Sequence, residues 1–191
     1  MQIVALEPPG NIARELALYR RSLFASLGEA SALAFPELAP LAFASGPRRL
    51  DARALGDCWA GIEGRFSSGG LLSSGSRLYL ELRGPLGELC ARVAAALGEG
   101  LASERSSPLD TGLGIFLCSH PDPEFAASEA ERIGPPRVDF LDCSLLLLGL
   151  RYAGEPFSGL AWRELARSRR RTGALRSVSS RRGSEGRHGA T

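Results

Sequence analysis

Residues 2–28 have the sequence QIVALEPPGNIARELALYRRSLFASLG, which predicts a strand followed by a helix. The apolar and β-branched run Gln2–Glu7 is typical of a strand, and the Pro-Pro-Gly that follows is a turn signal. Asn11 is a candidate N-cap and Gly28 a candidate stop for the helix. Between them, apolar residues recur at helical spacing, at Ile12, Leu16, Tyr19, Leu23 and Leu27.

The same order of elements returns in the middle of the chain. A strand at Leu38–Ala44 completes the first strand–helix–strand unit. A strand at Arg77–Arg83, a helical stripe from Leu86 to Leu101 and a strand at Leu113–Ser119 form the second unit. The paired strands are 38 residues apart in the first unit and 39 in the second. This repetition predicts two pseudo-equivalent lobes.

The segments around these units contain further elements. A short helix is expected at Asp51–Glu63, and a strand or hairpin around Leu71 and Leu72. Asp122, followed by proline and glutamate, predicts the start of a helix that ends near Ile133. A long apolar strand region follows at Val138–Tyr152. Ser158 is a candidate cap for a last helix that carries Leu160, Trp162 and Leu165.

Length and composition predict one soluble domain with a tail. The chain has 191 residues, of which 44% are hydrophobic and 23% charged, which is typical of a globular protein. We expect a single domain at residues 1–166 and a disordered tail at 167–191. No apolar run reaches the roughly 18 residues of a membrane span, and the N-terminus does not resemble a signal peptide. We therefore expect a cytoplasmic monomer that does not contact membranes.

The distribution of charge separates the tail from the rest. All 23 basic residues are arginine. Residues 167–191 hold eight arginines and one glutamate, a net charge of +7, whereas the rest of the chain carries −5. Such a tail is typical of a solvated, disordered terminus. Its alternative role is contact with RNA phosphates, with a salt-dependent affinity.

The sequence predicts neither a metal site nor a cofactor. The four cysteines, Cys58, Cys90, Cys118 and Cys143, are widely separated and form no CxxC pair, so we expect buried, reduced thiols. No phosphate-binding loop of the GxxxxGK[ST] type exists, because the chain has no lysine. We therefore expect the chain to hold no cofactor and no metal ion.

The first unit resembles the opening of 2H phosphoesterases, the 2′-5′ RNA ligase-like proteins. These enzymes carry a His-x-Thr or His-x-Ser motif on a strand of each lobe, and the first motif follows a proline-containing loop. Residues 35–43 read FPELAPLAF in this frame. Leu38 stands at the histidine position and Pro40 at the threonine position.

The second unit resembles the second motif strand of that family, and Gly114 replaces the histidine and Phe116 the threonine. The resemblance covers about residues 1–165 in element order. In the family, two imidazoles across a cleft exchange protons with water and the leaving oxygen. Leucine and glycine cannot transfer protons, and proline and phenylalanine offer no hydroxyl group.

The resemblance implies an α+β fold with two pseudo-equivalent lobes of mostly antiparallel sheet and outer helices around a central cleft. It implies a catalytically degenerate protein that retains nucleotide or RNA binding. One alternative is an active RNA 2′,3′-cyclic phosphodiesterase with non-standard groups, for which His120 is the catalytic candidate and Arg151 and Arg77 are the binding candidates. A second alternative is an RNA-binding or interaction protein that acts through the basic tail.

Overall fold

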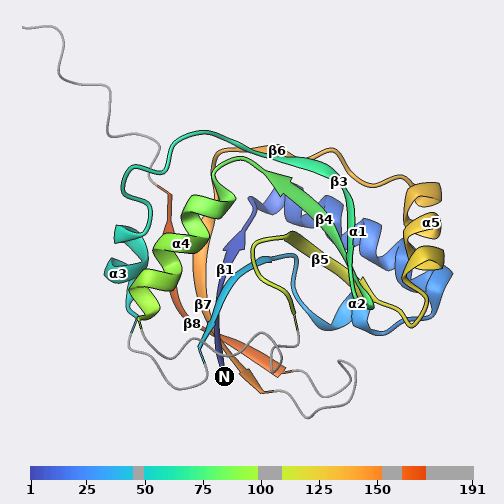
Figure 1. Cartoon of the computed structure of the whole chain (residues 1–191), viewed down its shortest axis with the longest axis horizontal. Coiled ribbons are helices and arrows are strands. Elements are labelled where there is room, and N and C mark those ends of the chain that lie inside the picture. The colour runs from blue at the N-terminus through green and yellow to red at the C-terminus, as the bar shows by residue number, and fades with distance from the viewer. Residues whose placement is uncertain (45–49, 99–108, 152–160, 171–191) are drawn as a thin grey trace, which may run out of the picture.

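Two four-stranded antiparallel sheets form the centre of the computed structural model, which describes residues 1–44, 50–98, 109–151 and 161–170 (Figure 1). The first sheet has the strand order β2-β1-β7-β8. Its strands are β2 (Ala39–Ala44), β1 (Gln2–Glu7), β7 (Ser144–Arg151) and β8 (Ala161–Arg169). The fold is therefore α+β, with mostly antiparallel sheets as the sequence predicted.

The second sheet has the order β5-β4-β3-β6. Its strands are β5 (Gly114–Ser119), β4 (Arg77–Arg83), β3 (Phe66–Ser74) and β6 (Asp139–Phe140). The two predicted units occupy equivalent places, because β1 pairs with β2 in one sheet and β4 pairs with β5 in the other. Both pairs are antiparallel and both contain one register shift. This arrangement is compatible with two lobes.

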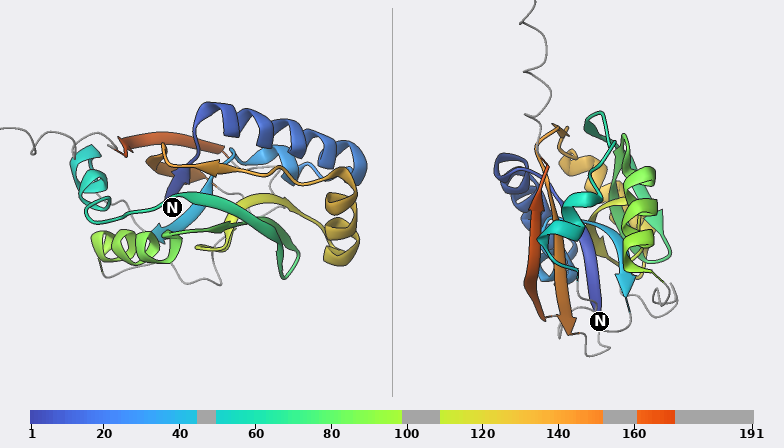
Figure 2. Two further views of the ribbon diagram at one scale, coloured as in Figure 1. Left: turned by 90° about the horizontal axis from the view of Figure 1, so that it is seen from above. Right: turned by 90° about the vertical axis from the view of Figure 1, so that its left-hand side faces the viewer.

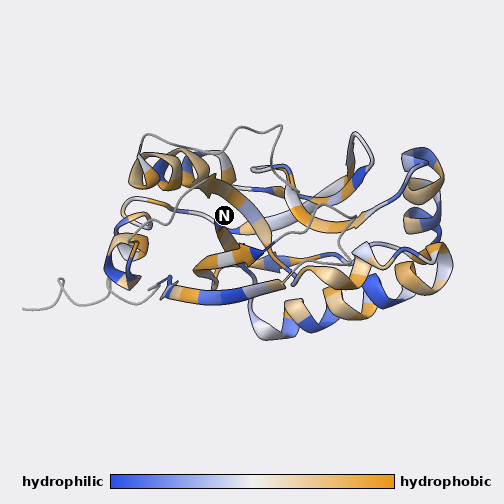
Figure 3. Cartoon of the chain, turned by 90° about the horizontal axis from the view of Figure 1, so that it is seen from below, coloured by the Kyte–Doolittle hydropathy of each residue, from blue (hydrophilic) through white to orange (hydrophobic). Residues whose placement is uncertain are grey.

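Five helices are found in the described residues. They are α1 (Gly10–Leu27), α2 (Ser31–Ala34), α3 (Ala52–Asp57), α4 (Leu86–Leu97) and α5 (Pro123–Ile133). The two longest, α1 and α4, lie on opposite sides of the sheets (Figure 2). Hydrophilic and hydrophobic residues follow each other along α1 (Figure 3), as expected for an amphipathic helix. None of the helices in these ranges is long and apolar enough to cross a membrane.

Each long helix packs against the sheet of the other unit. Helix α4 contacts β2, and α1 contacts β5 and α5. The Tyr19 hydroxyl of α1 donates a hydrogen bond to the Ala130 carbonyl of α5 at 2.9 Å. The edges of the two sheets also meet, because the Gly112 N–H donates to the Pro40 carbonyl of β2 at 2.9 Å. The two sheets are thus held together by helices and by backbone.

Alternation along the strands divides the core into two clusters. Val4 and Leu6 of β1 pack with the helices in the larger cluster, whereas Ile3 and Ala5 point to the opposite face. That face contributes to a second group, the inner cluster, which draws residues from both sheets. Its members are Ile3, Ala5, Phe35, Leu38, Phe43, Tyr79, Leu109, Phe116, Leu146, Leu148 and Leu150. All are at most 5% exposed, so the expected central cleft is closed at these residues.

The last predicted helix is wrong. Trp162 and Leu165 lie on strand β8, which pairs with β7 along its whole length. Ser158 and Leu160, which were expected to begin that helix, lie outside the described residues. Strand β8 also extends to Arg169, past the residue at which the tail was expected to begin.

Smaller differences concern the boundaries of elements. Helix α1 begins at Gly10 with Pro9 in the N-cap position, so Asn11 lies inside its first turn. Gly28 ends the helix as predicted, with φ 72°. The strand region at 138–152 divides into β6 and β7, and α3 ends at Asp57. Beyond its N-cap Asp122, α5 has the predicted bounds.

Candidate functional site

The first pair of motif positions carries no polar side chain. Leu38 lies just before β2 and is 3% exposed. Its N–H donates to the Pro36 carbonyl at 2.8 Å. Pro40 lies opposite Ala5 of β1, beside a register shift in the pairing. Because β2 is an edge strand, it tolerates a residue without an N–H group.

In the second pair of motif positions, residue 114 has no room for a side chain and residue 116 carries an apolar one. Gly114 begins β5 with φ 152°, a conformation that other residues rarely adopt. A Cβ atom at this position would lie 2.0 Å from the Leu80 carbonyl oxygen, so a histidine does not fit here. Phe116 is fully buried and meets the ring of Tyr79 edge-on, with ring centroids 5.7 Å apart.

Two of the four motif positions therefore belong to the inner cluster. Leu38 comes from the first unit and Phe116 from the second, and both are buried in the same apolar group. The structure thus brings Leu38, just before β2, and Phe116 of β5 to one place between the sheets. What it brings together is hydrocarbon, which can neither transfer a proton nor hold a phosphate oxygen.

A polar network lies at the edge of the inner cluster. The Tyr79 hydroxyl donates to Asp110 Oδ2 at 3.0 Å and accepts from the Asp110 N–H at 2.8 Å. Arg77 Nη1 lies 3.0 Å from Asp110 Oδ1. Burial raises the pKa of Tyr79, so its hydroxyl remains a neutral donor. Arg77, a predicted binding residue, is thus held by a carboxylate.

His120 does not approach the motif positions by any contact in the described residues. Its Nδ1 accepts from the Asp122 N–H at 3.0 Å, and its ring lies 5.7 Å from that of Phe125. The backbone N–H of His120 donates to the Ser76 carbonyl at 2.8 Å. Asp122 in turn caps α5 by accepting from the Phe125 N–H at 3.0 Å. These contacts place His120 in the turn that leads into α5.

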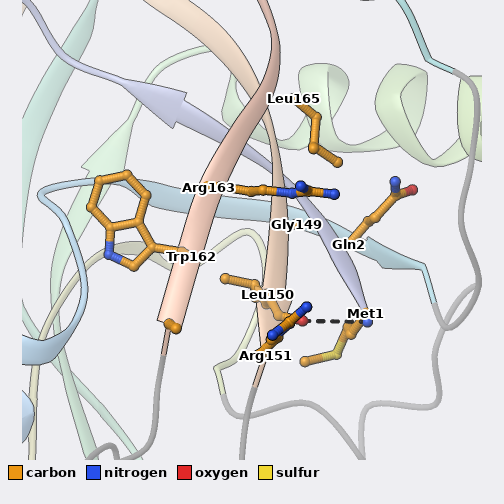
Figure 4. Close-up of a pocket in the computed structure, with 9 residues that line it drawn as sticks. Met1, Gln2, Gly149, Leu150, Arg151, Trp162, Arg163 and Leu165 are labelled. Atoms are coloured by element: carbon orange, nitrogen blue, oxygen red, sulfur yellow. Dashed lines mark hydrogen bonds between the residues drawn. The ribbon is translucent and has the colours of Figure 1, made fainter.

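Arg151, the other predicted binding residue, lies at the end of β7 in the first sheet. It lines a surface groove of about 510 Å³ (Figure 4). We call this the arginine groove, and its lining residues are Met1, Gln2, Gly149, Leu150, Arg151, Ala161, Trp162, Arg163 and Leu165. Arg77 belongs to the second sheet and does not line it, so the two predicted arginines do not form one site.

A second groove of about 510 Å³ lies where β1 leads into α1 and where β8 ends. Arg167 of β8 bridges Glu7 and Glu164 there. Hydrogen bonds from Arg167 lower the pKa of Glu164. Arg170 donates to the Ile62 carbonyl at 2.7 Å and lies 5.6 Å from the Trp59 ring centroid. The first arginines of the expected tail are therefore packed against the domain.

The cysteines do not provide a reactive group. Burial raises the pKa of Cys90 and Cys118 to about 11 and that of Cys143 to about 12. Cys58, whose pKa burial also raises, is the fourth free thiol. Neutral thiols are poor nucleophiles and poor metal ligands. Within the ranges that the structure describes, no three His, Cys, Asp or Glu side chains are placed to hold a metal ion.

Comparison with known proteins adds no relative. A scan against protein families finds none that matches the chain, and a search of curated proteins also finds no match. The function must therefore be argued from the geometry of the inner cluster and of the two grooves.

Proposed function

We propose that this chain is a catalytically inactive protein of the 2H phosphoesterase type that acts by binding rather than by turnover. The strand order supports this proposal, since each sheet pairs the two strands that flank one long helix. The resemblance of residues 35–43 to the first motif frame of that family supports it as well.

One observation carries the inactive assignment. The motif positions that would hold the two catalytic imidazoles are Leu38, which is 3% exposed in the inner cluster, and Gly114, where a Cβ would lie 2.0 Å from a carbonyl oxygen. General acid and base groups each contribute about 10²–10⁴-fold to such reactions. A site without either group has lost most of its rate enhancement.

The geometry argues against an active enzyme that uses other residues. Such an enzyme needs polar side chains that converge on a reacting atom. The polar network at the edge of the inner cluster is formed by Arg77, Tyr79 and Asp110, which bond to one another rather than converge on an open space. His120 is bonded to the N-terminal turn of α5 instead.

The test is an assay of the full chain on a 2′,3′-cyclic nucleotide and on a 2′-5′-linked dinucleotide, with product separated by chromatography. We expect no more product from the protein than from buffer. The variants H120A and D110N are measured in parallel. Turnover by the natural chain that either variant abolishes would overturn the proposal, since a contaminating enzyme would be insensitive to both substitutions.

RNA contact through the basic tail stays a separate prediction, because residues 171–191 lie outside the described residues. The structure sharpens its test. A deletion from residue 168 would remove the end of β8 and the contacts of Arg170. A deletion from residue 171 keeps both. If the tail binds RNA, this shorter deletion weakens binding and flattens its salt dependence.

A further inference from the structure

A glycine forms the floor of the arginine groove. Gly149 lies on β7, an inner strand of the first sheet, opposite Gln2 of β1 on one side and Arg163 of β8 on the other. Because residues that lie opposite each other in antiparallel strands point to the same face, Gln2 and Arg163 border the position where Gly149 has no side chain. The result is a hollow with a backbone floor.

Two guanidinium groups share this hollow. Arg151 lies two residues along β7 from Gly149 and therefore on the same face. It is opposite Ala161, which makes Arg163 its diagonal neighbour across the strands. Diagonal positions are about 7–8 Å apart, within the joint reach of two long side chains. In Figure 4, Arg163 extends from β8 across Gly149 towards Gln2.

A β-bulge supplies one wall of the groove. The pairing of β7 with β8 shifts by one residue between Leu147 and Leu148, which leaves Leu165 as the extra residue of β8. The side chain of Leu165 turns towards the hollow, and its Cδ1 lies 3.4 Å from the place where a Cβ of residue 149 would be. The bulge therefore adds an apolar wall beside two cations.

The charge of the groove is not compensated by the residues that line it. The described residues around it include no Asp or Glu. Neither Arg151 nor Arg163 forms an ion pair within the ranges that the structure describes. Arg167, four residues further along β8, is by contrast held by Glu7 and Glu164. Among the described residues, no carboxylate therefore competes with an anion for these two cations.

We propose that the arginine groove binds a phosphate group, carried by a nucleotide or by RNA. The guanidinium forks of Arg151 and Arg163 together offer more donors than the two oxygens of a carboxylate can accept, whereas a phosphate has three or four oxygens. The volume of about 510 Å³ is in the range of small-ligand sites. This inference rests on β1, β7 and β8 and not on the proposed function.

The test is isothermal titration of the full chain with AMP, adenosine and inorganic phosphate, followed by competition against a fluorescent single-stranded RNA of ten nucleotides. We expect AMP to bind and adenosine not to bind, because the phosphate provides the contact. AMP that displaces the RNA identifies a nucleotide-sized site. RNA binding that AMP does not displace, and that the groove variants weaken, identifies an RNA backbone as the source of the phosphate.

The variants R151Q and R163Q remove one cation each, and R14Q removes an exposed arginine of α1 as the matched control. Either groove variant should weaken binding by about tenfold and reduce its salt dependence by about one counterion, while R14Q leaves both unchanged. Equal binding by all three variants and the natural chain overturns the proposal. The proposal is also overturned if neither AMP nor RNA binds. Binding of poly-glutamate that AMP does not displace would overturn it as well. Thermal melts check that each variant is folded.

Discussion

The guanidinium of Arg20, 1% exposed, lies with Nη1 3.2 Å from Oε1 of Glu37, which joins α1 to the loop before β2. Its Nε donates to the Leu117 carbonyl of β5 at 3.3 Å. Burial lowers the pKa of Arg20, and the charge of Glu37 opposes that effect. The substitution E37Q leaves a buried cation without its counter-charge, so we expect a loss of about 2–3 kcal/mol in the free energy of unfolding.

Urea unfolding measures this loss, and E15Q is its control because Glu15 is exposed on the same helix. The control should stay within about 0.5 kcal/mol of the natural chain. Equal stability of E37Q and E15Q would show that Glu37 does not balance the charge of Arg20. The double variant R20M/E37Q should recover part of the loss, since it removes the buried charge itself.

The mutual hydrogen bonds of Tyr79 and Asp110 predict an order of stabilities. The substitution Y79F removes an acceptor from the Asp110 N–H and a donor from its carboxylate. Y19F removes one donor, to the Ala130 carbonyl. We expect Y79F to cost about 1–3 kcal/mol and to cost more than Y19F in chemical unfolding, because it leaves two groups unsatisfied. The reverse order would argue that the network at Asp110 is rearranged without loss.

The conformation of Gly114 predicts that a histidine side chain cannot be introduced at this motif position. The variant G114A places a Cβ against the backbone of β4, so we expect a loss on the order of 3 kcal/mol in thermal or urea unfolding. Gly87 of α4 has no atom within 4 Å of its Cβ position and provides the control. G87A should be as stable as the natural chain or up to about 1 kcal/mol more stable. A G114A protein as stable as G87A would contradict the assigned conformation.

Glu129 predicts a change of stability with pH. Hydrogen bonds from Arg132 and Ser26 lower its pKa to about 2, from a usual value of 4.5. Since the folded-state pKa is the lower one, the contribution of Glu129 is complete above pH 4.5 and is lost as the pH falls towards 2. Urea midpoints at pH 6 and pH 3 should therefore differ less for E129Q than for the natural chain. An equal difference for E129Q and the natural chain would contradict this role of Glu129.

The local patterns of the sequence predicted most elements of the two sheets, because alternation and turn residues act over a few positions. Strand β8 was missed for a physical reason. Trp162 and Leu165 are three residues apart, which is a helical spacing, although on strand β8 their side chains point away from each other (Figure 4). Periodicity alone cannot separate these two cases over so short a segment.

The polar contacts of the candidate site were beyond such patterns. Arg20 meets Leu117 across 97 positions, and Tyr79 meets Asp110 across 31. The residues next to Arg20 and Tyr79 in the sequence contain no pattern that indicates these partners. Arg151 was predicted as a binding residue, but its diagonal neighbour Arg163 was assigned to a helix, which would have placed it elsewhere. Pairing of β7 with β8 was the missing information.

The strand order also has a consequence for the growing chain. The second sheet is drawn from one continuous stretch, from β3 to β6, whereas β1 must wait for β7, whose first residue is Ser144. Synthesis of the roughly 100 residues between β2 and β7 takes about 5–20 s at typical ribosomal rates. During that time β1 presents an open edge beside a completed neighbour. We therefore expect the nascent chain to expose an apolar strand edge that is open to pairing with other chains until β7 is made.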